Sequence, residues 1–395
     1  MKRVAITGIG ALTPLGYDFQ SSWEALKKGT SGITAISRFD ASGLAWKRAG
    51  EIKALDLEEF FAIKEMNRLD PFTLYGAFSA RMALEDAGLP VNGLEAGVVI
   101  GSSRGGITML EKALLKGRRI SPYTMHASTV GMAASFIAQK FGVKGRSLGV
   151  SSACASGMHA IGEAYGLIKK GQEKIVLSGG AEAPITRLCI EGYGRAGALS
   201  KTDSRFASRP FGSGRDGFVL SEGACVLILE EYKNAVKRKA RIYGEIIGYG
   251  NIISALHETR PDPNGEIECM GLPLKEAGLL PEEVGLISAH ATGTQLGDRI
   301  EADAIKEIFG IKVPVTALKS LTGHMLSASG PFEAAAALMC LREGLLPPYP
   351  HLKENESGLK ISIKGEKIKG GYALVNSFGF GGFCASLALK AEPLI

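Results

Sequence analysis

One cysteine of this 395-residue chain stands in a run of small residues, "SLGVSSACASGMHAIGEAYG" (147–166). Cys154 has only Ser, Ala and Gly within three positions on either side. The residues after it carry apolar side chains at helical spacing, which predicts a helix that begins just beyond the cysteine. A helix N-terminus stabilises a thiolate and lowers its pKa, and small neighbours leave room for an electrophile. Taken alone, the residue is equally typical of a buried structural cysteine.

Three further groups that could take part in catalysis stand at strand ends or in turns. His290 follows a buried apolar run in "LISAHATGT", and Lys319 and His324 flank a Gly-containing turn in "LKSLTGHMLSASG". A lone histidine after a strand is more often structural. A thiol, two imidazoles and an ammonium group in such positions of one fold together indicate Cys-based covalent catalysis.

Three acidic residues accompany these groups. Asp298 and Glu301 follow His290 and could anchor its loop or hydrogen-bond a basic partner, and Glu333 stands near the start of a predicted helix. Near the C-terminus, "NSFGFGG" (376–382) is so rich in glycine that we expect its backbone to approach a ligand or to form a moving gate. An ordinary tight turn is the alternative for this segment.

Alternating β-rich runs and helical patterns would have to position these residues. Strands are predicted in the runs "RVAITGIG", "AGVVIGSS", "EKIVLSGGAE", "GACVLILEE", "GLISAHATGT" and "YALVNSFGFGG". Helices are predicted over 71–87, after Cys154 and after Pro331. This alternation favours an α/β fold with helices on both faces of the sheet. Cys154 and His324 each occupy a turn before a helix, which suggests an internal duplication with halves 1–240 and 241–395.

Composition excludes several other classes of protein. The formal net charge is +6, and aromatic residues do not alternate with Lys and Arg as nucleic-acid binding would favour. No apolar run reaches the ~18 residues that span a bilayer. The six cysteines lack metal-ligand spacing, so we expect neither a metal site nor a disulfide framework. We expect a cytoplasmic protein without nucleic-acid or membrane partners.

The motifs that carry these residues resemble a known family. "VSSACASG", "SRPFGSGRDGFVLSEGA", "HATGTQLGDRIE", "KSLTGHMLSASG" and "NSFGFGG" resemble segments of the β-ketoacyl-[acyl carrier protein] synthases of the decarboxylating elongation type, in the family's order. The resemblance covers essentially the whole chain. It implies a thiolase-like fold, with two related α/β halves in five α-β-α-β-α layers, and a homodimer.

The resemblance also implies roles for the residues that match. Cys154 would be the nucleophile that takes an acyl chain from an acyl carrier protein. His290 and His324 would assist decarboxylation of the malonyl-carrier and stabilise the enolate. Lys319 would belong to a network with the acid at Glu301.

Two further residues match supporting positions of the family. Glu333 would be a buried acid of the Lys319 network. Phe378 would be an aromatic gate, whose backbone N–H forms an oxyanion hole with that of Cys154. No metal or organic cofactor is implied beyond the phosphopantetheine arm of the carrier. The resemblance predicts chain extension by two carbons in fatty acid synthesis. The alternatives are a ketosynthase of a polyketide, polyene or other specialised acyl pathway, and a non-catalytic partner subunit.

Five basic residues complete the expectations. Arg104 stands where long-chain enzymes of this family carry an apolar residue of the acyl pocket, so it could shorten the pocket or pair with a carboxylate of the acyl chain. Equally, it could pair with a protein acid at a dimer interface. Lys64, Arg68, Arg118 and Arg119 stand where the family places basic residues that dock the acidic carrier.

Overall fold

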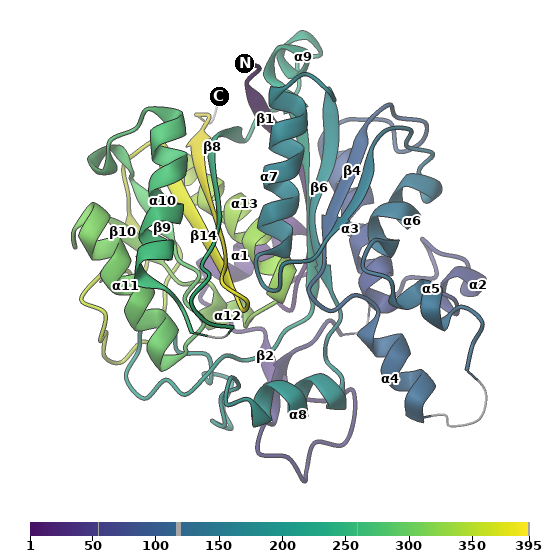
Figure 1. Ribbon diagram of the computed structural model, residues 1–395, viewed down its shortest axis with the longest axis horizontal. Helices are drawn as coiled ribbons and strands as arrows, with labels where there is room; N and C mark the ends of the chain where they lie inside the picture. The colour runs from purple at the N-terminus through teal and green to yellow at the C-terminus, as the bar shows by residue number, and fades with distance from the viewer. Residues whose placement is uncertain (54, 116–119, 259, 394–395) are drawn as a thin grey trace.

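The computed structural model describes residues 1–53, 55–115, 120–258 and 260–393 (Figure 1). Within these ranges eleven strands form one mixed sheet, in the order β12-β10-β9-β14-β15-β8-β1-β7-β6-β4-β5. The sheet divides into two wings, which meet where β1 (Val4–Leu12) pairs antiparallel with β8 (Gly244–Ile253). No helix of the described residues is long and apolar enough to cross a lipid bilayer.

The first wing contains five strands in the order β5-β4-β6-β7-β1. After β1 its principal elements are, in chain order, α3 (Pro71–Asp86), β4 (Gly97–Gly101), α6 (Met132–Lys140), β5 (Ser147–Val150), α7 (Ser156–Lys169), β6 (Ile175–Glu182) and β7 (Gly223–Glu231). β4 is parallel to β5 and β6, whereas β7 is antiparallel to β6 and β1.

The second wing repeats this order. After β8 its elements are α10 (Pro263–Ala277), β9 (Leu286–Ser288), α11 (Gln295–Phe309), β10 (Pro314–Thr316), α13 (Ser329–Glu343), β14 (Tyr372–Gly379) and β15 (Phe383–Ala391). Its strands run β10-β9-β14-β15-β8, with β12 (Lys360–Ile361) added at the outer edge. Because the two wings share one sequence of elements and one strand order, the predicted duplication into related halves is confirmed.

Helices form three layers around the two wings. α7 and α13 lie between the wings, since α7 packs on β4 and β6 and also on β15, while α13 packs on β14 and β15 and also on β7 (Figure 1). α3 and α6 cover the outer face of the first wing, and α10 packs against the second wing with α11 beside it. Ala334 to Ala337 of α13 are buried, and these small side chains let the helix fit between two sheets. The five α-β-α-β-α layers are therefore present.

Shorter elements connect this framework. They are α1 (Phe19–Lys27), β2 (Ile33–Ala35), β3 (Arg48–Gly50), α2 (Ile63–Met66), α4 (Ile107–Leu115), α5 (Thr124–Ser128), α8 (Arg187–Arg195), α9 (Tyr232–Lys237), α12 (Lys319–Thr322), β11 (Leu345–Leu346) and β13 (Glu366–Lys367), with 3₁₀ turns at Pro281–Glu283 and Leu326–Ala328.

The predicted elements are found with small shifts. All six predicted strands are present, and the helix expected over 71–87 ends at Asp86. The helix expected after Pro331 begins at Ser329, because a proline in the first turn of a helix has no intrahelical N–H bond to lose. Cys154 precedes α7 and His324 precedes α13, which are equivalent positions in the two halves. The fold thus brings both turns to the layer where the halves meet.

Candidate active site

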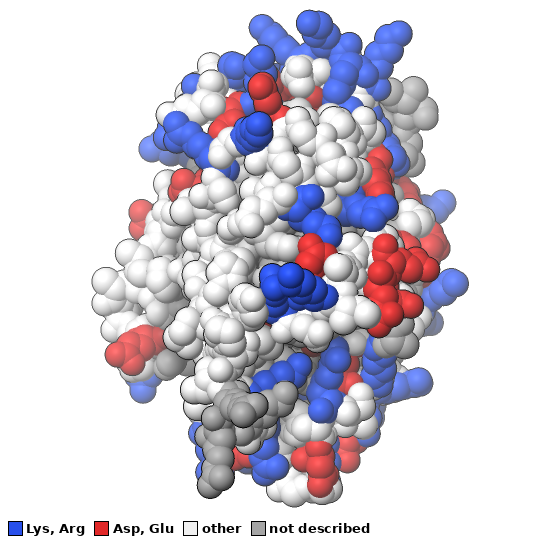
Figure 2. All heavy atoms as spheres, turned by 90° about the vertical axis from the view of Figure 1, so that its right-hand side faces the viewer, with Lys and Arg blue, Asp and Glu red and all other residues white. Residues whose placement is uncertain are grey.

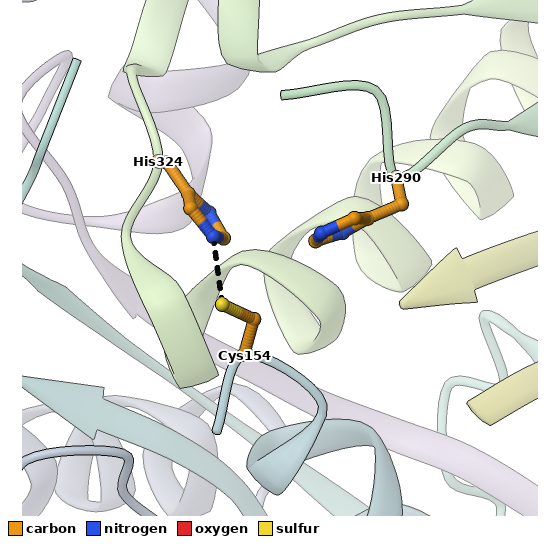
Figure 3. A group of neighbouring side chains, drawn as sticks. All are labelled: Cys154, His290 and His324. Carbon is orange, nitrogen blue, oxygen red and sulfur yellow. Dashed lines mark hydrogen bonds between the residues drawn. The ribbon is translucent and has the colours of Figure 1, made fainter. Parts of the chain in front are cut away.

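A thiol and two imidazoles converge from three separate segments (Figure 3). Nε2 of His324 lies 3.1 Å from Sγ of Cys154. The rings of His290 and His324 have centroids 5.3 Å apart and are nearly perpendicular. Cys154 comes from the turn between β5 and α7, His290 follows β9, and His324 follows α12. The cluster is buried, and its three residues come together only in the folded chain.

The turn that carries Cys154 is held in an unusual conformation. Ala153 has a positive φ of 50°, a region that costs about 1–2 kcal/mol for a residue with a Cβ atom. Ser156 holds this turn, because its Oγ accepts from Ser152 N at 2.8 Å and donates to Ala153 O at 2.5 Å. The thiol is thereby fixed at the N-terminal end of α7, as predicted.

Two glycines allow other segments to approach this turn. A methyl group at Gly157 of α7 would lie 2.0 Å from the carbonyl oxygen of Ser327, so this glycine admits the segment that follows His324. A methyl group at Gly379 would lie 3.2 Å from the backbone nitrogen of Cys154. Ser377 strengthens this second contact by donating its Oγ–H to the Cys154 carbonyl at 3.2 Å.

Burial keeps all three groups of the cluster neutral. It raises the pKa of the Cys154 thiol to about 12, although the charges of Lys319 and Arg104 act in the opposite direction. The predicted lowering of the thiol pKa is therefore wrong for this state, since desolvation outweighs the favourable charges. Burial and the charge of Lys319 hold the pKa values of His290 and His324 well below the usual range. A neutral His324 is placed to accept the thiol proton.

Lys319 pairs directly with Glu333, one of the two acids expected in its network. Its Nζ lies 2.6 and 2.9 Å from the two carboxylate oxygens of Glu333, and both side chains are almost fully buried. Burial raises the pKa of Glu333 and the Lys319 ammonium opposes that rise. The carboxylate of Glu301 accepts hydrogen bonds from other groups and makes no direct bond to Lys319. Burial raises the pKa of Glu301, and the charge of Lys319 opposes that rise, so the two residues of the expected network interact through space.

Glu301 and Asp298 of α11 hold the loop that carries His290. Glu301 accepts hydrogen bonds from the backbone of His290 and Ala291, both at 2.7 Å, and from the amide of Asn376 at 3.2 Å. Asp298 accepts from Gly293 N at 3.0 Å and from a neighbouring backbone at Phe211, and Nε of Arg215 lies 3.6 Å away. The anchoring role predicted for both acids, and the basic partner of Asp298, are present.

A cavity of about 290 Å³ opens beside the cluster, near the lower end of the ~300–1,000 Å³ range of ligand sites. Cys154, His290 and His324 form part of its wall together with Phe378. The Phe378 ring lies 6.1 Å from that of His290, measured between centroids. Phe378 thus lines the same cavity as the thiol, and the gate and oxyanion-hole roles expected of it stay predictions.

Several lining residues had not been singled out in the sequence. Cys384 of β15 lines the cavity. Phe218, which precedes β7, lines it as well, and its ring packs edge-on against His324. A polar wall is added by Ser254, Glu258, Arg260 and Asp262 of the segment between β8 and α10, and by Glu266 in the first turn of α10. This segment contains "HETRPDPNGE", a run typical of an exposed loop, and only tertiary packing places it at the thiol.

Arg104, Lys64 and Arg68, the predicted ligand-binding basic residues that the structure describes, do not line this cavity. Arg104 is exposed, its Nε donates to Ser103 Oγ at 3.2 Å, and its guanidinium lies 5.7 Å from the Tyr193 ring centroid. Lys64 is exposed on α2, and the guanidinium of Arg68 lies 4.6 Å from the Tyr123 ring centroid.

The face that bears α2 and α5 carries both signs of charge. Figure 2 shows Lys and Arg gathered at its upper end, whereas acidic side chains accompany them lower down. Arg118 and Arg119, the other two predicted docking residues, lie outside the described residues.

Cys154, His290 and His324 are also the one group of three possible metal ligands among the described residues. Their ligand atoms lie within 4.8 Å of one another. A thiol and two imidazoles would suit a soft divalent cation such as Zn²⁺. The same atoms form the nucleophile and base described above, so the cluster is a single site.

Comparisons with known proteins agree with this geometry. The N-terminal domain model of β-ketoacyl synthases matches residues 1–235, and the C-terminal domain model matches residues 243–353. The chain is 39% identical over 407 residues to the 3-oxoacyl-[acyl-carrier-protein] synthase 2 of Coxiella burnetii and 40% identical over 407 residues to that of Synechocystis sp. Each comparison covers 98% of both chains.

Solved structures extend the likeness to three dimensions. The ishigamide ketosynthase/chain length factor superposes with a TM-score of 0.93 at 30% identity over 99% of both chains. A β-ketoacyl synthase from Burkholderia phymatum STM815 gives the same TM-score and identity over 99% of this chain and 100% of the other. The fold is thiolase-like, and the chain belongs to the β-ketoacyl synthase family.

Proposed function

We propose that this chain is a condensing enzyme that transfers an acyl group from an acyl carrier protein to Cys154. It then extends that group by two carbons with malonyl-carrier, giving a 3-oxoacyl-carrier. The observation that carries the proposal is the contact of 3.1 Å between Cys154 Sγ and His324 Nε2, beside His290 and at a cavity. A thiol is a good nucleophile and a good leaving group, which both transfer steps require.

In the first step the thiol becomes a thiolate by giving its proton to His324. The sulfur attacks the carbonyl carbon of the acyl-carrier thioester and forms a new C–S bond. The bond to the carrier's sulfur breaks, and that sulfur takes the proton from His324. Backbone N–H groups of Cys154 and Phe378 are assigned to the carbonyl oxygen during the attack, a role supported by the close approach of Gly379 to Cys154 N.

In the second step malonyl-carrier loses CO₂. The electron pair of the broken C–C bond forms an enolate, whose carbon attacks the acyl carbonyl on Cys154. The C–S bond then breaks, and the departing Cys154 thiolate takes one proton from solvent to become the thiol again. Neutral imidazoles of His290 and His324 each supply one N–H donor for the enolate oxygen, and removal of such a donor costs about 10²–10³ in rate. Lys319, held by Glu333, supports this role because its charge disfavours protonation of both rings.

The enolate is stabilised by hydrogen-bond donors in this scheme, so we propose no metal or organic cofactor beyond the phosphopantetheine arm of the carrier. The carrier itself is proposed as the partner. One solved relative is titled as a type II polyketide ketosynthase with its acyl-carrier protein, and it matches with a TM-score of 0.89 at 29% identity. Complementary charge would steer an acidic carrier to Lys64, Arg68, Arg118 and Arg119.

We also propose a homodimer in the cytoplasm. β5 is the terminal strand of the sheet, and Leu148 on it is 49% exposed, so this edge can pair with a second copy. Arg104 is proposed to border the acyl pocket across that interface. The six cysteines are all free, as in a reducing compartment.

The names of the curated relatives favour chain extension in fatty acid synthesis. One solved relative is a type II polyketide ketosynthase in complex with its acyl-carrier protein, which favours a specialised acyl pathway as the second candidate. The reaction at Cys154 is the same in both cases, and the acyl-chain preference separates them.

The test is condensation with purified components. Wild-type protein incubated with acyl-carrier and malonyl-carrier should give a 3-oxoacyl-carrier two carbons longer, detected by mass spectrometry. C154A should give none, and H290A and H324A should each lower the rate about 10²–10³-fold. C225A, which alters a buried cysteine in β7, is the matched control. A wild-type chain that forms no product while remaining folded would contradict the proposed function.

A further inference from the structure

The cavity beside Cys154 has a buried acidic group that the proposed reaction does not use. Glu266, in the first turn of α10, lines this cavity and is only 2% exposed. Its Oε2 atom has no hydrogen-bond partner among the described residues. A buried polar group left without a partner is costly, so its presence needs an explanation beyond folding.

The neighbouring acids, unlike Glu266, have hydrogen-bond partners for their carboxyl groups. Asp262 accepts from Ser254 Oγ at 2.9 Å and caps α10 through Asn264 N at 3.1 Å. Glu301 accepts three hydrogen bonds, and Asp298 accepts two and has Arg215 beside it. The carboxyl group of Glu266 is therefore the one of these four that is available to a ligand.

The protonation state of the Glu266 carboxyl group decides which ligand groups it can hydrogen-bond. Burial raises the pKa of Glu266 well above its usual range, and the charges of Glu301, Asp262 and Asp298 raise it further. Both effects favour the protonated form, which is a neutral acid with one O–H donor and one carbonyl acceptor. It is therefore suited to a hydroxyl, keto or amide group, and no cation or anion is needed to match it.

Its location connects this group with the segment that carries Phe378. Ser254 begins the segment between β8 and α10, and its N–H donates to Gly382 O at 2.8 Å. In the same segment Glu258 O accepts from Gly381 N–H at 2.6 Å. Both Phe378 and Glu266 face the cavity that contains the thiol. The ligand within reach of Glu266 is therefore a molecule that is covalently bound to Cys154 or about to react with it.

We propose that Glu266 is a specificity-determining residue, which hydrogen-bonds a neutral hydroxyl, keto or amide group of the thioester ligand in the Cys154 cavity. Such a group can belong to an oxygenated acyl chain or to the pantetheine arm. The inference rests on the proposed function only in taking the cavity to hold a thioester-linked ligand.

Binding of unreactive analogues tests this inference without any turnover. The probes are acyl-pantetheine amides, in which nitrogen replaces the thioester sulfur, prepared with chains of equal length. One series has plain alkyl chains, and the other carries a hydroxyl or keto group at successive positions. Dissociation constants are measured by calorimetry for wild type, E266A, E266Q and E268Q. Glu268 is an exposed acid of the same helix that does not line the cavity, so E268Q is the matched control.

The two ligand sources give different patterns. If Glu266 binds the acyl chain, E266A weakens binding of at least one oxygenated probe about five- to tenfold more than binding of its alkyl counterpart. If it binds the pantetheine arm, E266A weakens both series about equally. In either case E266Q, which keeps a donor and an acceptor, recovers most of the loss, and E268Q binds like wild type.

Unchanged or tighter binding of every probe by E266A would overturn the inference, as would a wild type that binds no probe. Circular dichroism establishes that each variant is folded. A chain that shows the Glu266-dependent binding pattern but forms no 3-oxoacyl product would contradict the proposed function and leave this inference standing.

Discussion

Residues around Cys154 owe their protonation states to burial more than to their neighbours' charges. The thiol is neutral although the charge of Lys319 favours a thiolate, and both imidazoles are neutral because burial and the charge of Lys319 act in the same direction. Glu182, at the end of β6, shows the same effect on an acid. It accepts hydrogen bonds from the backbone of Ser103 and of Arg104, yet burial raises its pKa to about 7.

The raised pKa of Glu182 makes stability depend on pH with a definite sign. Below the ordinary value of 4.5 the group is protonated in both states, and stability is lost as the pH rises through about 7. The glutamine of E182Q does not titrate. The free energy of unfolding of E182Q relative to wild type should therefore rise by roughly 3 kcal/mol between pH 4 and pH 8. Urea unfolding of both proteins across this range measures the difference.

E191Q serves as the control for this measurement. The pKa of the partly exposed Glu191 is lowered, mainly by its hydrogen bonds to Arg187 and Arg195, so this variant should show no such gain. Parallel pH curves for E182Q and wild type would contradict the assignment of a raised pKa to Glu182.

At the scale of elements, the site depends on how closely α7 can approach the segment that follows His324. Two glycines of α7 have opposite surroundings. The Cβ position at Gly157 is 2.0 Å from Ser327 O and 2.8 Å from Pro331, whereas nothing lies within 4 Å of that position at Gly166. The first glycine is required by packing, and the second only weakens the helix.

G157A should therefore lose about 1–3 kcal/mol of stability through overpacking, and its condensation rate should fall because the Cys154 and His324 turns are forced apart. G166A should gain about 0.5–1 kcal/mol, since alanine is the better helix former, with the condensation rate unchanged. Urea unfolding and product formation measure both. A G157A protein as stable and active as wild type would show that the close approach is not needed.

The sequence pattern predicts these elements well where the signal is local. The small residues around Cys154 and the apolar stripe after it define a turn and a helix within some twenty residues. The partner of Lys319 could not be predicted from such a local pattern. Glu301 and Glu333 both had suitable chemistry, and only the packing of α11 and α13 gives Glu301 to the backbone of His290 and leaves Glu333 to Lys319.

At the scale of the whole molecule, the duplication explains why the site lies where it does. The turn before α7 carries the thiol and the equivalent turn before α13 carries His324, so the layer between the wings brings them together. This arrangement could be predicted from the repeated strand, turn and helix pattern. The thiol pKa and the polar wall at Glu266 could not, because burial and contacts between distant segments exist only in the folded chain.

The intact mass of the protein after incubation with acyl-carrier alone tests the central claim most directly. Wild type should gain the mass of one acyl group, and peptide mapping should place it on Cys154. C154A should gain nothing, and H324A should be labelled more slowly, since His324 accepts the thiol proton. An unmodified wild-type chain, or an acyl group on one of the other five cysteines, would contradict the assignment of Cys154 as the nucleophile.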